Sequence, residues 1–543
     1  MGSRIGTIAC PRATVRQIVG TPVSGNFSLR RMQIDGAGAG REVVRRRAMT
    51  THIRTAYPRF PNNRWLARCS ALAIGLLSPA VGAQDMVPAP LPAPLQAPTV
   101  PQVVLPQLSP AQAATLTTLI ARDAVAQGLT DAAPVLPQDS EALVRAALDH
   151  ARAVHAGRLD EADFQRDWAI RPVAFDPLPG FRDAVARDRL AAWIASLPPP
   201  YAGYDTLVAG LARYRAIADA GGWAALIGGP ELTFGATGPR VVALRARLAI
   251  EDPEVTKTGA RFDAALVQAV RRAQRRYGLN PAGVVGAQTI AAFNVPANQR
   301  IRQIRANMER WRWLPPTLEK DRVQVNIAAA VLTLFDGDAP VMSMKAVTGR
   351  PGDETPMLVS RIHSIVLNPP WNVPTGIADR ELWPKEKASP GYLKRNGFRV
   401  IDTGDGGKRL QQSSERSALG KFKFDFDNSF SVYLHDTPAQ AGFARFDRLA
   451  SHGCVRLEKP AELARQLMRG TPEWPVPAID ATVAAGKTVR AKLAEPVAVY
   501  LLYWTAFGSP TGQVGFRDDP YRWDGALAGK IEARSARAAL ASR

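Results

Sequence analysis

The hydrophobic pattern of this chain changes its period near residue 320. Upstream, apolar residues recur three or four positions apart, as Leu207 and Leu211 do, which is typical of helices. Downstream, apolar and polar residues alternate, as around Val323 and Val325, which is typical of strands. The sequence therefore predicts a multidomain α+β protein with a helical first part and a β-rich second part.

Composition divides the chain further. Residues 86–112 contain eight prolines among Ala, Val, Leu and Gln, a composition that favours an extended tether over a packed core. The predicted segments are a signal peptide region 1–83, a proline-rich linker 84–112, a helical domain 113–230, a small three-helix module 231–295, a connecting helix 296–320, a β-rich domain 321–525 and a tail 526–543.

The N-terminal segment reads as an export signal. Residues 1–83 carry +11 of the net charge of +21. Arg64 and Arg68 precede the short apolar run Cys69–Leu77, and small residues follow up to Ala83, where we expect cleavage. The run is too short to remain as a membrane span. Because much of the basic charge lies in this segment, the charge does not indicate nucleic-acid binding.

Cleavage would also simplify the cysteine content. It would remove Cys10 and Cys69 and leave Cys454 as the one thiol of the mature chain. Cysteines of exported proteins usually pair, so a lone thiol there is expected to have a chemical role. Met49 would make a conventional start for such a signal, so residues 1–48 are interpreted as an over-extended start.

Cys454 lies in a segment suited to nucleophilic chemistry. The segment Ser451–Arg456 reads Ser-His-Gly-Cys-Val-Arg, and His435 precedes it. An imidazole within reach of a thiol is expected to lower the thiol pKa toward neutral and to act as its base. Gly453 lets the backbone approach a substrate, whose oxyanion nearby N–H groups could hold. The residue types alone leave two alternatives open, a buried structural cysteine and a zinc site.

The remaining residues of this segment are predicted to support the site. His452 is a second candidate base, two positions from the cysteine. Arg456 is either a clamp for a substrate carboxylate or a structural ion-pair donor. Ser451 is expected to fix the local turn by hydrogen bonding, and Gly453 to meet a backbone requirement.

The spacing of these residues resembles a known family. His435, fifteen intervening residues and then Ser451–Arg456 resemble the signature of murein L,D-transpeptidases with the YkuD-type catalytic domain. Further segments resemble the large Gram-negative members of that family: Asn368–Pro374, Pro390–Leu393, Ala418–Phe424, Leu434–Pro438 and Gly515–Tyr521.

The resemblance implies a role for each predicted segment. It implies a β-sandwich catalytic domain over residues 321–525, with a lid over about 374–420. It also implies an α-helical scaffold over 113–230 and a peptidoglycan-binding domain over 231–295.

The implied activity is the formation of 3→3 cross-links between peptidoglycan stems. Cys454 would form a thioester with a donor tetrapeptide, and the amine of a diamino acid in an acceptor stem would resolve it, with His435 as general acid and base. The implied location is the periplasm, with no membrane span after signal cleavage. No metal-ligand spacing occurs, and we expect neither metal nor cofactor. The alternatives are an L,D-carboxypeptidase, an enzyme that anchors proteins to peptidoglycan, and a non-catalytic wall-binding protein.

Overall fold

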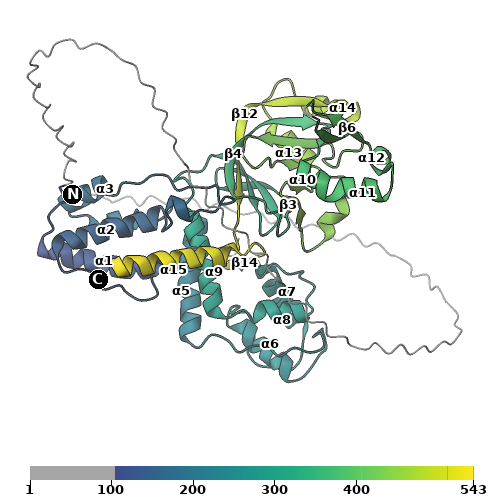
Figure 1. Cartoon of the computed structure of the whole chain (residues 1–543). Helices are drawn as coiled ribbons and strands as arrows, with labels where there is room; N and C mark the ends of the chain where they lie inside the picture. Colours follow the sequence, from purple (N-terminus) through teal and green to yellow (C-terminus); the bar gives the residue numbers. More distant parts are fainter. Residues whose placement is uncertain (1–103, 405, 510–511, 542–543) are drawn as a thin grey trace, which may run out of the picture. The chain divides into compact units, whose positions relative to one another are not determined.

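The computed structural model describes residues 104–404, 406–509 and 512–541 (Figure 1). The chain divides into two compact units, Met1–Ala97 and Pro98–Arg543, and all described residues belong to the second. The predicted signal peptide and most of the predicted linker lie outside the described residues. Within them, no helix combines the length and apolar character needed to cross a membrane.

The helical part begins with a compact group of helices. Ser109 caps the first helix with a capping box, and Asp139 caps the second by accepting the N–H of Ala142. Buried side chains such as Leu116 and Val144 form a separate core for its first four α-helices, whereas buried residues of its last helix, such as Leu207, belong to the main core of the molecule. Its elements are α1 (Pro110–Ala126), α2 (Ser140–His155), η1 (Glu161–Asp163), α3 (Leu178–Ala186), α4 (Leu190–Ala195) and α5 (Ala202–Asp219).

Three short helices form the next module, as predicted. They are α6 (Pro239–Ala249), α7 (Ala264–Arg276) and α8 (Ala287–Phe293). Val241, Leu266 and Phe293 are buried between them.

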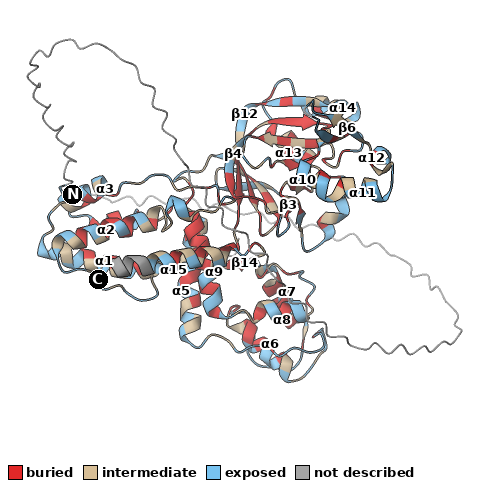
Figure 2. Ribbon diagram, viewed as in Figure 1, coloured by how far each residue is buried: buried red, intermediate tan, exposed pale blue. Residues whose placement is uncertain are grey.

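The long helix α9 (Ala297–Trp311) connects the module with the β-rich part. Most of its residues are buried, as Figure 2 shows in red. Asn307 donates to the hydroxyl of Thr505 at 2.7 Å, and Arg310 pairs with Asp524 at 2.5 Å. Asp524 lies in α15 (Trp523–Ala541), which packs against α9. The segment after residue 526, which in sequence suggested only an Ala- and Arg-rich tail, is thus part of a helix.

The β-rich part is built on one large sheet, which confirms the predicted fold class. The strand order is β10-β3-β11-β9-β8-β4-β12-β1-β2, and β2 also pairs with β3, so the sheet closes on itself. Strand β1 pairs in parallel with β12, far along the chain, with Val323 opposite Val499. The strands are β1 (Asp321–Asn326), β2 (Val331–Asp336), β3 (Ala339–Gly349), β4 (Leu358–Leu367), β8 (Phe422–Phe426), β9 (Leu434–His435), β10 (Leu449–Ser451), β11 (Val455–Leu457) and β12 (Val489–Leu502).

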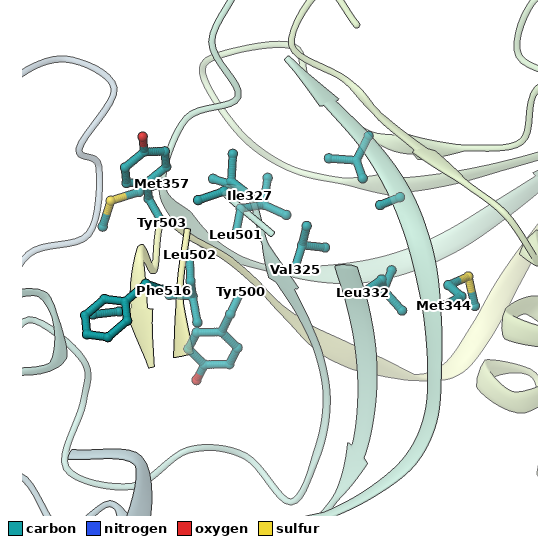
Figure 3. Packing of buried hydrophobic residues seen from close by; sticks show 14 of the residues in the cluster. Val325, Ile327, Leu332, Met344, Met357, Tyr500, Leu501, Leu502, Tyr503 and Phe516 are labelled. Carbon is teal, nitrogen blue, oxygen red and sulfur yellow. The ribbon is translucent and has the colours of Figure 1, made fainter. Parts of the chain in front are cut away.

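Alternating side chains of these strands fill the interior of the sheet. Val325, Leu332 and Leu501 are fully buried and belong to one cluster that continues through Tyr503 and Phe516 (Figure 3). Two helices, α13 (Pro460–Leu467) and α14 (Val476–Ala484), and the small hairpin β13 (Ala506–Gly508) and β14 (Val514–Phe516) complete this part.

The predicted lid segment has a regular structure that the sequence pattern did not reveal. A three-stranded sheet in the order β5-β7-β6 packs with the short helices of the segment around a small core of its own, centred on Leu382 and Leu410. The glycine-rich stretch 404–407 joins β6 to β7. The elements are β5 (Trp371–Asn372), α10 (Thr375–Ile377), η2 (Ala378–Leu382), α11 (Trp383–Ala388), α12 (Tyr392–Arg395), β6 (Phe398–Asp402) and β7 (Lys408–Gln412).

Candidate active site

The turn between β10 and β11 presents Cys454. Gly453 has φ of +105°, a conformation that favours glycine, and a Cβ there would lie 3.2 Å from the carbonyl oxygen of Glu354. The Ser451 hydroxyl donates to the carbonyl of Cys454 at 2.6 Å and accepts the N–H of Gly453 at 3.2 Å. Ser451 therefore makes the turn-fixing contacts expected of it, and its hydroxyl is engaged with the backbone.

A buried threonine, which sequence reasoning missed, holds the same turn from outside. Thr355 Oγ1 donates to the carbonyl of Gly453 at 2.7 Å and accepts the N–H of Gly349 at 2.9 Å. The Tyr521 hydroxyl accepts the N–H of Thr355 at 3.3 Å and donates to the carbonyl of Gly349. The catalytic turn is thus fixed to β3 and to the C-terminal segment.

His435 lies on β9, next to the strand that follows the cysteine. In the parallel pair β9 and β11, Leu434 is opposite Val455 and His435 is opposite Arg456. His435 is buried, and its Nδ1 bonds to the carbonyl of Asp436, which orients the ring. A carbonyl can only accept, so Nδ1 carries the proton and Nε2 keeps its lone pair. This is the tautomer that a general base requires.

The electrostatics of this pair differ from the sequence expectation. Burial, followed by the positive charge of Arg456, lowers the pKa of His435 to about 3, so the imidazole is neutral. Burial raises the pKa of Cys454 above the usual thiol value, although Tyr433, Lys423 and Arg456 act in the opposite direction. The expectation of a thiol with a lowered pKa is therefore wrong for the free site. At neutral pH the thiol and the imidazole of the free site are thus both uncharged.

Both residues open into one pocket of about 480 Å³. The catalytic sheet supplies one wall, and the lid supplies the other through Ile377, Arg380 and Glu381. The pocket brings together five of the six predicted site residues: Ser451, His452, Cys454, Arg456 and His435. Gly453, the sixth, shapes the turn from behind.

His452 is engaged by the lid. Its Nε2 lies 2.6 Å from Oε1 of Glu381, a residue that sequence reasoning missed. Arg350 lies 3.5 Å from the same carboxylate and 2.8 Å from Asp353, which also pairs with Arg380 of the lid at 2.9 Å. The pKa of Glu381 is lowered, first by its hydrogen bond with His452. This network connects the lid to the catalytic turn, so His452 serves the lid contact and His435 is the better placed base.

Arg456 adds a positive charge to the pocket. The half-buried guanidinium forms no ion pair or hydrogen bond with any side chain that the structure describes, and burial lowers its pKa. Lys423, by contrast, pairs with Asp425 at 2.7 Å and lies 4.4 Å from the centre of the Tyr433 ring. Of the two predicted roles for Arg456, the structure thus favours the carboxylate clamp over the structural ion pair.

Tyr433 contacts the nucleophile directly. Its backbone N–H and its hydroxyl both act on the thiol of Cys454 in the direction that favours the thiolate. Trp371 donates to the Tyr433 hydroxyl, which links the lid sheet to the nucleophile. Tyr433 and Trp371 both line the pocket.

The part of the chain that the structure describes holds no cluster of potential metal ligands. No group of three or more His, Cys, Asp and Glu side chains is placed to hold an ion there.

Three family models match this chain. Residues 320–477 match the L,D-transpeptidase catalytic domain of the YkuD type. These residues therefore form an L,D-transpeptidase catalytic domain. Elsewhere in the chain, residues 237–293 match a "Putative peptidoglycan binding domain" and residues 141–211 match a scaffold domain. This set of domains belongs to peptidoglycan metabolism.

Individual proteins are also similar to this chain. A "Putative L,D-transpeptidase" of Haemophilus influenzae is 31% identical over 235 residues, which cover 40% of this chain and 47% of that protein. The match thus spans about half of the relative's length.

Two solved L,D-transpeptidase structures also match. One, from Xylanimonas cellulosilytica, is 16% identical with a TM-score of 0.16, over 51% of this chain and 99% of that one. The other, from Stackebrandtia nassauensis, is 13% identical with a TM-score of 0.22, over 50% and 94%.

Proposed function

We propose that the protein is a peptidoglycan L,D-transpeptidase that forms 3→3 cross-links through a thioester on Cys454. The observation that carries the proposal is the shared pocket. A thiol from the turn before β11 and a neutral imidazole from β9 open into it, together with a guanidinium that has no side-chain partner among the described residues. Such a pocket suits acyl transfer on a substrate that bears carboxylates.

The first step forms the thioester. Cys454 Sγ attacks the carbonyl carbon of the third residue of a tetrapeptide stem, and the thiol proton moves to Nε2 of His435. The tetrahedral intermediate collapses, the bond to the terminal D-Ala nitrogen breaks, and the imidazolium gives its proton to the leaving amine. Since both groups begin neutral, the thiolate need exist only during the attack.

The second step resolves the thioester. The side-chain amine of a diamino acid in a neighbouring stem attacks the thioester carbon, and His435 accepts its proton. The carbon–sulfur bond breaks, the new amide forms the 3→3 cross-link, and the proton returns to the sulfur. Water as the acceptor would give a carboxypeptidase, and a protein lysine would give an anchoring enzyme.

Two groups are suited to bind the substrate during these steps. The backbone N–H of Cys454 makes no hydrogen bond to any described residue, so it is free to hold the oxyanion. The Arg456 guanidinium is free to bind a carboxylate of the stem, in two parallel hydrogen bonds where the geometry permits.

The location of the enzyme follows as part of the same proposal. The basic N-terminal region, the apolar run and the small residues before Gln84 support export to the periplasm. Peptidoglycan stems are accessible there. The free thiol of Cys454 would then be the one cysteine of the mature protein.

The decisive experiment follows both protein and product. The mature chain from Gln84 is incubated with purified disaccharide tetrapeptide, and protein and muropeptides are analysed by mass spectrometry, with Cys454→Ala as control. A thioester adduct and 3→3 dimers, both lost in the variant, would support the proposal. Tripeptide without dimers would indicate hydrolysis. Binding to sacculi without any turnover would indicate a non-catalytic wall-binding protein.

A further inference from the structure

A second cleft, of about 560 Å³, lies between the peptidoglycan-binding domain and the catalytic sheet. Residues 275–279 at the end of α7 form one side. Residues 328–331 after β1 and residues 446–449 before β10 form the other, and residues 517–520 close it. No lining residue is shared with the active pocket. The cleft is therefore a separate site built from two domains.

Arg517 places an uncompensated charge in this cleft. Its Nη1 donates to the carbonyl of Phe516 at 2.6 Å and lies 3.5 Å from that of Arg276, and its guanidinium lies 5.0 Å from the centre of the Phe507 ring. No described carboxylate lies within ion-pair distance. Burial and then the neighbouring charge of Arg448 lower its pKa to about 10. A Cβ at Gly278 would lie 2.4 Å from Arg517 Cδ, so the absence of a side chain there makes room for the arginine. An anion is the partner that this group lacks.

The other charges of the cleft are mixed. Arg275 is exposed and its side chain forms no hydrogen bond or ion pair with the described residues, whereas Arg448 donates to backbone carbonyls, among them Ala329 and Ala330 at 3.2 Å. Asp447 and Asp518 also line the cleft, and neither pairs with an arginine. Three guanidinium groups and two carboxylates suit a ligand that carries carboxylates and an amine together.

An aromatic side chain lines the cleft, and only a short stretch of chain separates the cleft from the active pocket. Phe446 is 44% exposed and offers an apolar face at the cleft. Leu449 lines the cleft and Cys454 lines the active pocket, and five residues of chain span at most about 18 Å. One polymer strand could therefore occupy both sites.

We propose that this cleft binds the acceptor stem of peptidoglycan through its carboxylates while the donor stem occupies the active pocket. The inference rests on the proposed function, because only a transpeptidase needs two stems at once. Arg275 and Arg517 would hold the acceptor carboxylates, and Phe446 would contact the apolar part of the stem.

The test separates donor from acceptor. The thioester is formed with disaccharide tetrapeptide, and disaccharide tripeptide, which lacks the terminal D-Ala, is then added as acceptor at increasing concentration. In Arg275→Ala and Arg517→Gln we expect the half-saturating acceptor concentration to rise about tenfold, since one charged hydrogen bond is lost. The rate of thioester formation stays unchanged. Arg261→Ala is the matched control, because this exposed arginine of the same domain lies outside the cleft and its side chain forms no hydrogen bond or ion pair with described residues.

Each outcome decides the inference. Unchanged half-saturation in both variants would overturn it, and so would a parallel slowing of thioester formation. Binding of disaccharide tripeptide to the Cys454→Ala protein, measured by calorimetry, needs no chemistry and should weaken about tenfold in the same two arginine variants. If the wild-type protein forms no thioester, the proposed function fails, and calorimetry alone still decides whether the cleft binds a stem.

Discussion

The two walls of the active pocket are built on different physical principles. The wall that carries His435 and Cys454 belongs to the closed sheet, where backbone hydrogen bonds and a large core fix every strand. The lid wall has only a small core around Leu410 and is joined to the catalytic turn by polar contacts such as that of Glu381 with His452. The comparison indicates that the rigid sheet wall carries the catalytic residues, whereas the weakly attached lid wall controls the access of substrate to the pocket.

The strongest test of the comparison concerns the base on the sheet wall. We expect His435→Gln to slow thioester formation by about 10²- to 10⁴-fold, because the thiol proton then has no acceptor at that position. Stopped-flow measurement with disaccharide tetrapeptide gives the rate. His363→Gln is the control, since that half-exposed histidine lies outside the pocket. An equal loss in both variants would mean that the assigned role of His435 is wrong.

The pH dependence of thiol reactivity tests the neutral pair. The raised pKa of Cys454 predicts that alkylation by iodoacetamide increases about hundredfold between pH 7 and pH 9, because the thiolate fraction grows tenfold per pH unit below the pKa. The lowered pKa of His435, about 3, predicts no inflection near the usual histidine value. A plateau from pH 5 to pH 8 would instead reveal a preformed thiolate and imidazolium pair.

A third prediction concerns binding at the sheet wall. We expect Arg456→Gln to raise KM for the tetrapeptide about tenfold, because a charged hydrogen bond to a carboxylate is lost, with a smaller effect on kcat. Steady-state kinetics give both constants. Arg456→Lys, which keeps the positive charge but loses the two parallel N–H donors of the guanidinium, should recover part of the affinity. An unchanged KM in Arg456→Gln would exclude the clamp.

The smallest expected effect lies on the lid. Glu381→Gln removes a partly exposed pair with His452, worth about 0.2–1 kcal/mol, so lid opening should become at most about fivefold more frequent. Hydrogen exchange of the amides in α11 reports this opening. Glu415→Gln is the control, as this exposed lid residue has no contact with the catalytic turn. If the exchange rate of those amides falls or stays the same in Glu381→Gln, the contact between Glu381 and His452 does not hold the lid closed.

Sequence reasoning recovered what local patterns encode. The change of hydrophobic period gave the division into helical and β-rich parts, and one short segment gave Cys454, His435 and their neighbours. It missed partners that come from distant parts of the chain. Glu381 is 71 residues from His452, and Thr355 is 98 residues from Gly453, so only the folded chain brings them together.

The direction of the thiol pKa could not be predicted for a related reason. A nearby imidazole suggests a lowered value, but burial, which depends on the packing of the whole pocket, raises it. The helix α15 was missed because its Ala- and Arg-rich sequence has no clear stripe, and its buried residues Leu527 and Ile531 are fixed by packing in the main core.

The pairing of β1 with β12 has a consequence for how the protein acquires its structure. Val323 needs Val499 as its neighbour, so the sheet cannot close until nearly the whole chain has left the ribosome or the export channel. Until then the catalytic strands have unpaired edges. We therefore expect the helical domains to fold early and the thiol to become a competent nucleophile only after release of the C-terminal segment. Acyl-transfer activity would then appear only once the C-terminal segment has joined the sheet, and a nascent chain would be inactive.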